Sequence, residues 1–256
     1  MKPMLLIKLA ISLAVLVLTA LVAAHPEALT AEVSEATPSA ESQNIPGLDD
    51  PSLPSYRPPP QIKFPRARVG GVARGSMGKD PAVLALVPDH VAWTSHSKPT
   101  LYWHIDKITT LPIVFTLRED EAVRPLLEAT LTPPKQAGLQ VIRLKDHGVE
   151  LQEGITYRWF VAVQRDPDSP SQDIVTGGMI ERVPFVEIHV LCPSFSNESD
   201  PGKLASCGLW YDAIGAVCDK MESTPQDPLL CRQLAKLLAD AGLRELAEFY
   251  LKCAKA

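Results

Sequence analysis

The residues with the clearest potential to bind a metal ion lie in one short stretch of the chain. His104 and Asp106 are two positions apart, and His90 and His96 lie nearby in the sequence. Residues two apart on a β-strand point to the same face, so His104 and Asp106 could approach one ion together. A metal site needs three or four convergent ligands, held by a surrounding layer of hydrogen bonds. One such pair is more typical of surface polar residues, and we expect no metal here.

A second group of acidic residues has the composition of a calcium-binding loop. Asp166, Asp168 and Asp173 lie close together in a segment rich in proline and serine. In a loop of the EF-hand type, the fifth position supplies a ligand and the sixth is glycine. Here Pro170 stands at the fifth position and no glycine follows it. The spacing therefore argues against such a loop, and we expect no cofactor.

No group of residues has the spacing of a nucleophilic active site. The chain lacks the Gly-x-Ser-x-Gly pattern that places a nucleophilic serine on a sharp turn. His189 and Cys192 are close in sequence, but the two residues between them, Val190 and Leu191, indicate an apolar segment. We assign no catalytic residue and expect a protein that is not an enzyme.

Aromatic side chains could instead form a binding surface. On the strand predicted at residues 100–106, Trp103 falls on one face, and Tyr102 and His104 fall on the other. If Trp103 lies in the core, Tyr102 and His104 could be exposed. Together with Trp210 and Tyr211, they are the residues we single out as a possible binding surface.

The element that organises the chain is a predicted hairpin over residues 157–183. Tyr157, Trp159, Val161 and Val163 alternate with other residues, which is typical of a strand with one face on a core. The return strand at 173–183 contains Gly177-Gly178, which predicts a bulge.

Five further strands share this pattern of short alternating segments separated by turn residues. Seven strands within about a hundred residues, with no amphipathic helix between them, favour an antiparallel immunoglobulin-like β-sandwich over residues 81–183. The predicted strands span residues 83–87, 100–106, 112–119, 125–131, 139–145, 155–164 and 173–183.

The last part of the chain, residues 184–256, is predicted to be helical. Helical patterns occupy 204–221 and 229–256, and the segment that begins Gly208-Leu209 is echoed by the one that begins Gly242-Leu243. The offset of 34 residues is the period of the tetratricopeptide repeat. Each glycine is expected at the turn between paired helices, where a positive φ suits it. We therefore predict tetratricopeptide-like helical hairpins.

The N-terminal region has the features of an exported protein. Lys2 and Lys8 precede an apolar stretch at residues 9–21, and small residues lead up to Ala24. This pattern predicts a secretory signal peptide over residues 1–24, cleaved after Ala24, and hence a periplasmic or secreted protein with no stable membrane span after cleavage. The alternative is a retained membrane anchor.

A linker is predicted between the signal peptide and the β domain. Residues 25–62 are acidic and proline-rich, and residues 63–79 are basic and glycine-rich. Such compositions bury little apolar surface, so residues 25–80 are expected to be disordered. The basic part could contact an anionic surface, although a solvated linker is the simpler interpretation. The net charge of −5 argues against nucleic acid as a partner.

All five cysteines lie within the helical part: Cys192, Cys207, Cys218, Cys231 and Cys253. An oxidising compartment would permit disulfides, but cysteines in helices usually act as small buried apolar groups. The number is odd, so at least one thiol stays free in a monomer. The sequence leaves the pairing open.

Several short segments together resemble one bacterial secreted family, the domain of unknown function 928, over roughly residues 80–255. The family often has cysteine where Arg165 stands and tryptophan where Met179 stands, so two positions depart from it. The resemblance implies a secreted or periplasmic protein and no assigned activity. The matching segments are 84–88, 98–103, 157–159, 166–167, 180–182 and 210–213.

Two kinds of function follow from these observations. The first is a non-catalytic module of the cell envelope that binds a protein, peptide or other ligand, with an envelope protein or peptide as its partner. The second is an envelope hydrolase that acts on glycan or peptide, and a ligand sensor for a membrane signalling partner is a further alternative. Because the sequence offers no convergent set of catalytic residues, we expect the first.

Overall fold

The computed structural model describes most of the chain from residue 45 onward, namely residues 45–60, 63, 66–70, 80–166, 168–193, 195–196 and 199–254. The predicted signal peptide and residues 25–44 lie outside the described residues. All strands and helices belong to one unit, residues 42–256. Within the described part, no helix combines the length and apolar character needed to cross a membrane.

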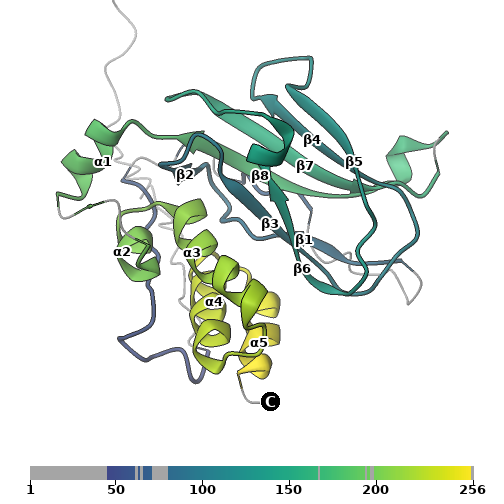
Figure 1. The fold of residues 1–256 in the computed structure, drawn as a ribbon. Helices are drawn as coiled ribbons and strands as arrows, with labels where there is room; N and C mark the ends of the chain where they lie inside the picture. The colour runs from purple at the N-terminus through teal and green to yellow at the C-terminus, as the bar shows by residue number, and fades with distance from the viewer. Residues whose placement is uncertain are drawn as a thin grey trace, which may run out of the picture. The chain divides into compact units, whose positions relative to one another are not determined.

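In the described part of the chain, eight strands form two sheets (Figure 1). One has three strands in the order β1-β3-β6, and the other has five in the order β2-β8-β7-β4-β5. The strands are β1 (Val83–Ala85), β2 (Ala92–Thr94), β3 (Thr100–Ile105), β4 (Ile113–Glu119), β5 (Leu127–Leu131), β6 (Gly138–Arg143), β7 (Thr156–Val163) and β8 (Ile174–Arg182).

All seven predicted strands are present, and β2 is an additional one. β2 pairs with β8 in the parallel direction, so the five-stranded sheet is mixed and the prediction of an antiparallel fold is wrong at this edge. β2 has only three residues, all buried, so it shows no alternation from which a strand could be predicted.

The central hairpin of β7 and β8 is regular along its whole length. Eight consecutive residue pairs run from Thr156 opposite Glu181 to Val163 opposite Ile174, so the predicted bulge at the two glycines is wrong. Gly177 and Gly178 instead allow close approach of neighbouring groups. A Cβ on Gly177 would lie 2.1 Å from the carbonyl oxygen of Trp159, and one on Gly178 would lie 2.7 Å from a methyl group of Val87.

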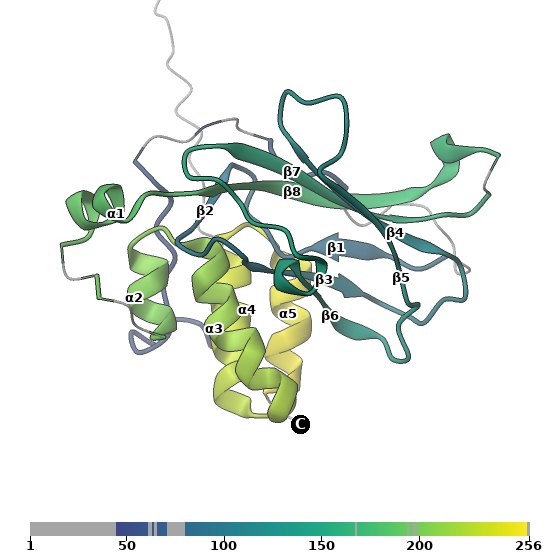
Figure 2. The same ribbon diagram turned by 45° about the horizontal axis from the view of Figure 1, so that its top comes forward.

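The helices cover one face of the β part and share its core (Figures 1 and 2). Trp159, which is fully buried as predicted, donates its indole N–H to the Tyr211 hydroxyl at 2.8 Å. That hydroxyl donates in turn to the carbonyl oxygen of Met179 at 3.1 Å. Trp210 donates its indole N–H to the carbonyl oxygen of Leu86 at 2.9 Å. The predicted change from strands to helices near residue 184 is therefore not a boundary between separate cores.

Five helices follow β8. Two 3₁₀ turns, η1 (Leu144–His147) and η2 (Pro170–Gln172), lie within the β part. The helices are α1 (Phe185–Leu191), α2 (Pro201–Ser206), α3 (Trp210–Ser223), α4 (Pro228–Asp240) and α5 (Arg244–Cys253).

The two glycine-leucine turns have the same local geometry. Gly208 has φ 79° between α2 and α3, and Gly242 has φ 74° between α4 and α5. Leu209 donates its backbone N–H to the carbonyl oxygen of Leu204, and Leu243 does the same to Leu238. This is the hydrogen-bonding pattern of a glycine that ends a helix. The predicted role of both glycines is confirmed.

The structure resolves the cysteine pairing that the sequence leaves open. Cys192 is bonded to Cys207, and Cys231 is bonded to Cys253. The first disulfide joins the residues that end α1 and α2, and the second joins α4 to α5. Cys218 is a free, buried thiol, and burial raises its pKa well above the usual value.

Residues 45–60 are packed against the helices, so the prediction that residues 25–80 are disordered is wrong for this segment. Four of its side chains belong to the core: Ile45, Leu48, Leu53 and Tyr56. The ring of Tyr56 makes an edge contact with Trp210 at 4.9 Å between centroids, and its backbone N–H donates to Asp240 at 2.9 Å. Apolar side chains spaced along an extended, proline-containing chain can fill an apolar surface without forming a helix or strand.

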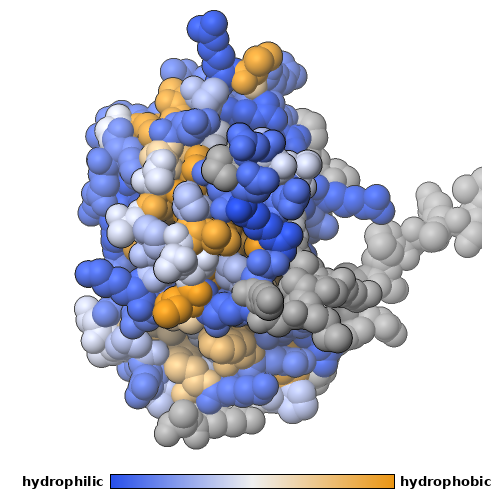
Figure 3. Space-filling model, turned by 90° about the vertical axis from the view of Figure 1, so that its right-hand side faces the viewer, coloured by the Kyte–Doolittle hydropathy of each residue, from blue (hydrophilic) through white to orange (hydrophobic). Residues whose placement is uncertain are grey.

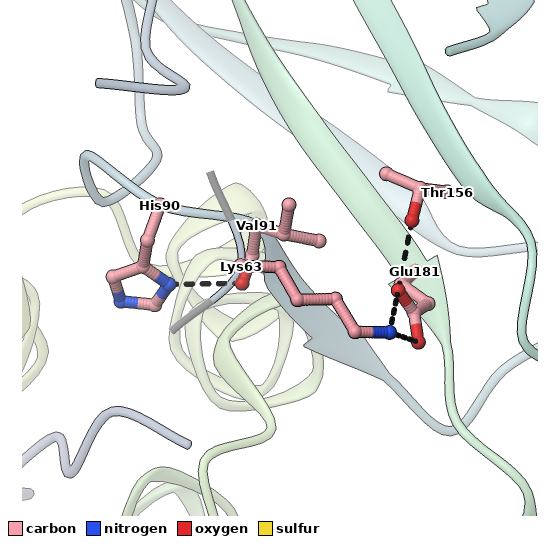
Figure 4. A network of polar contacts seen from close by, with 5 residues as sticks. All are labelled: Lys63, His90, Val91, Thr156 and Glu181. Carbon is pink, nitrogen blue, oxygen red and sulfur yellow. Dashed lines mark hydrogen bonds and ion pairs between the residues drawn. The ribbon is translucent and has the colours of Figure 1, made fainter. Parts of the chain in front are cut away.

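The basic segment that follows is also attached to the β part. The ammonium group of Lys63 binds both carboxylate oxygens of the buried Glu181, at 2.9 and 3.0 Å, and the Thr156 hydroxyl donates to the same carboxylate at 2.8 Å (Figure 4). Val69 and Gly177 exchange two backbone hydrogen bonds of 3.0 Å. Lys63 and Val69 therefore both attach this segment to β8, the first through an ion pair and the second through a β-bridge.

Candidate functional site

The four residues predicted as a binding surface are buried, so the prediction that they are exposed is wrong, although Tyr211 contributes to the lining of the cleft described below. Tyr102, Trp210 and Tyr211 are exposed by at most 3% of their surface, and His104 is exposed by 6%. The outward face of β3 is covered by α3 and α5, which the alternation of the strand could not reveal.

Tyr102 and His104 instead attach β3 to the helices. The hydroxyl of Tyr102 donates to Asp219 of α3 at 2.5 Å. The Nδ1 atom of His104 lies 3.1 Å from the hydroxyl of Tyr250 in α5, and its ring makes edge contacts with Tyr250 and Phe249. Two helices are thus fixed to one strand by polar contacts within an otherwise apolar interface.

Histidine and aspartate side chains considered for metal binding make other contacts in the structure. His90 lies 3.4 Å from the hydroxyl of Tyr56, and Asp106 accepts the backbone N–H of Ala82 at 2.7 Å. Across the described residues, no group of three or more His, Cys, Asp or Glu side chains is placed to hold a metal ion.

Burial makes His104 sensitive to acid. Desolvation lowers its pKa from 6.5 to about 4, against a smaller opposing effect of Asp106. Between these two values the unfolded chain binds a proton that the folded chain does not, so stability should fall as the pH falls from 6.5 to 4. The expected loss is roughly 3 kcal/mol, complete near the folded pKa and absent above the unfolded one.

Measurements of the free energy of unfolding by urea across this pH range test the prediction. His104→Gln should flatten the pH dependence by that amount, and His147→Gln, at an exposed position, should leave it unchanged. Equal slopes for the parent chain and His104→Gln would contradict the prediction.

A cleft of about 630 Å³ lies between the β2–β3 turn and the helices. The turn supplies Lys98, and η1 supplies Lys145. The facing wall is formed by α3 with Asp212 and Lys220, and by Phe195 from the loop between α1 and α2. The volume is within the usual range for small-ligand sites, which is about 300–1,000 Å³.

A buried carboxylate stabilises the floor of the cleft. Asp212, exposed by only 5%, accepts the hydroxyl of Thr94 at 2.5 Å. It also accepts the backbone N–H of Ser95 at 2.9 Å and the Ser95 hydroxyl at 2.5 Å. Asp212 lies in the first turn of α3, where a negative charge is favoured by the helix dipole. The turn and α3 are therefore held in a fixed relation, which is what a pre-formed site requires.

In the part of the chain that the structure describes, some of the lysines that line the cleft have an acidic partner and others do not. Lys98 pairs with Glu150 at 2.7 Å on the outer side. Asp212 and Asp219 already accept hydrogen bonds from hydroxyl groups. Within the described residues, Lys145 and Lys220 have no acidic partner in ion-pair contact. The cleft can thus offer two cations to a ligand.

Little in the sequence indicates this cleft, because its residues come from four distant segments. The segment at 210–213 was noted for its resemblance to a family and, at Trp210 and Tyr211, as a possible binding surface; of these residues Tyr211 and Asp212 line the cleft. Lys145 and Lys220 carry no local motif, so only the folded chain brings them to one site.

Comparison with known proteins agrees with this resemblance. The family model described as Domain of Unknown Function (DUF928) matches residues 69–251, which include every strand and nearly all of the helical part. No curated protein matches the chain. The match covers well over half of the sequence, and the chain belongs to the DUF928 family.

Proposed function

We propose that this protein is a non-catalytic interaction module of the cell envelope, and that its ligand binds in the cleft beside α3. The observation that carries the proposal is a hollow of ligand size, built on a sheet turn and a helix that Asp212 holds together. A site on such fixed elements loses little conformational entropy when it binds.

Export to the periplasm or beyond is part of the same proposal. The basic and apolar residues of the N-terminus are typical of a cleaved signal peptide, and the two disulfides suit an oxidising compartment. The partner would be an envelope protein or peptide. The acidic composition disfavours nucleic acid.

The finer architecture supports a scaffold role. We propose that the two sheets correspond to an immunoglobulin-like sandwich and that α2–α3 and α4–α5 are tetratricopeptide-like hairpins. Two features support this: one core joins both sheets, and the turns at Gly208 and Gly242 share one geometry 34 residues apart. The hairpins would then contribute the helical wall of the cleft.

The alternative of an envelope hydrolase would use Ser95, whose hydroxyl contacts Asp212. His96 is the nearest histidine in sequence, but its only hydrogen bond among the described residues is from its backbone N–H to Thr94. A serine nucleophile needs an adjacent base of suitable pKa, so this geometry favours binding. The alternative of a ligand sensor uses the same cleft and is distinguished by the identity of the partner.

Site-specific photo-cross-linking in the native envelope tests the proposal. A benzoylphenylalanine placed at Lys98, on the rim of the cleft, should give a discrete cross-linked product that mass spectrometry identifies. The same group at Lys135, in an exposed loop of the β part, should not. Identical products at both positions, or none at Lys98, would contradict binding in the cleft.

A further inference from the structure

The cleft continues into an exposed apolar surface on α1. Phe195 lines the cleft, and its ring centroid lies 6.0 Å from the rings of both Phe185 and His189. Proteins in solution rarely leave neighbouring large apolar side chains exposed without a use for them. Four such residues of α1 are exposed by 44% to 76%: Phe185, Val186, Val190 and Leu191.

This apolar surface is fixed in place. Ile188 is the buried residue of α1, and it anchors the helix to the core. The disulfide from Cys192 to Cys207 joins the end of α1 to the end of α2. The backbone N–H of Phe195 donates to the carbonyl oxygen of Cys192 at 2.9 Å, which orients the residue between α1 and the cleft. The surface is thus pre-organised next to Phe195 at the edge of the cleft.

The charges and shape indicate which kind of ligand fits. Lys145 and Lys220 favour an anionic group in the cleft, and the exposed side chains of α1, which adjoin the cleft through Phe195, favour a large apolar group. Three of the four exposed apolar side chains of α1 are aliphatic, and aliphatic groups suit a peptide side chain better than a sugar ring. A bilayer could contact α1, but it could not extend a carboxylate into a cleft of about 630 Å³.

We propose that the cleft and α1 together bind an extended peptide that carries an acidic side chain close to a large apolar one. This inference rests on the proposed function. The carboxylate binds between Lys145 and Lys220, and the apolar side chain packs on Val186 and Val190. On the face shown in Figure 3, apolar side chains are scattered among hydrophilic ones.

Selection from a random linear peptide library against the exported, disulfide-bonded chain tests the inference. Selected peptides should be enriched in Asp or Glu within a few positions of Leu, Ile or Phe. A fluorescent consensus peptide should then bind the Lys145→Gln/Lys220→Gln variant roughly tenfold more weakly, with a reduced dependence on salt. The Val186→Ser/Val190→Ser variant should be weakened to a similar extent.

The matched control is Lys135→Gln/Val123→Ser, which changes an exposed lysine and a valine exposed by 96% elsewhere in the β part. It should leave affinity within twofold. Selected peptides without enriched acidic residues, or full affinity in both cleft variants, would overturn the inference while cross-linking at Lys98 still upheld the proposed function. Absence of both selected peptides and cross-links would overturn both. Binding to phosphatidylcholine vesicles through Val186 and Val190, with no peptide selected, would also refute the peptide ligand.

Discussion

Trp159→Ala should lower the free energy of unfolding by about 3–5 kcal/mol. Trp159 is completely buried in the middle of β7, next to Phe115, and its indole N–H donates to Tyr211. The substitution leaves a large cavity and removes the donor to a buried hydroxyl group. The loss is a large part of the stability of a typical domain, about 5–15 kcal/mol. Urea denaturation of the purified variant and of the parent chain measures the difference.

The neighbouring residue provides the control for this prediction. Phe160 lies on the opposite face of β7, where it is only partly buried beside Gly177. Phe160→Ala should therefore cost clearly less than Trp159→Ala. A Trp159→Ala protein of near-normal stability, or equal losses for both variants, would contradict the assignment of the two faces.

Removal of residues 25–60 should lower stability by several kcal/mol, although the composition of this segment suggests a dispensable linker. The four core side chains that it supplies are each worth about 1.5–3 kcal/mol when fully buried. Its loss would also expose the apolar surface of Trp210, which Tyr56 contacts. Thermal and urea unfolding of a chain that begins at Gln61, compared with one that begins at Ile45, measures the effect.

A single substitution tests the same point without a deletion. Tyr56→Ala should cost about 3–5 kcal/mol, as large-to-small changes of buried aromatic residues do. Ser55→Ala, at an exposed neighbour, should change stability by less than about 0.5 kcal/mol. If Tyr56→Ala behaves like Ser55→Ala, residues 45–60 do not stabilise the fold.

Local pattern was enough to predict the strands, and the reason is visible in β7. Its buried and half-buried residues alternate along the whole strand, so the sequence carries the period directly. β2 has three buried residues in a row, which is too short a run to show a period. The glycine pair in β8 was interpreted as a bulge, because sequence cannot show that Val87 packs where a Cβ would lie.

The helices that cover one face of a strand could not be predicted from local pattern. Tyr102 and His104 were assigned correctly to the face opposite Trp103, but α3 and α5 bury that face from more than a hundred residues away. In residues 45–60 the acidic and proline-rich composition concealed a few apolar side chains that matter. The cleft depends on distant segments in the same way, since Lys145 and Lys220 are brought together only by the fold.

The contact between Tyr56 and Asp240 joins residues 184 positions apart, and this has a consequence for the time course of folding. Residues 45–60 can reach their final contacts only after α4 has been synthesised. Contacts between such distant residues slow folding, because a long loop must close before they stabilise the chain. During synthesis these residues therefore lack their partner Asp240 until almost the whole chain is present.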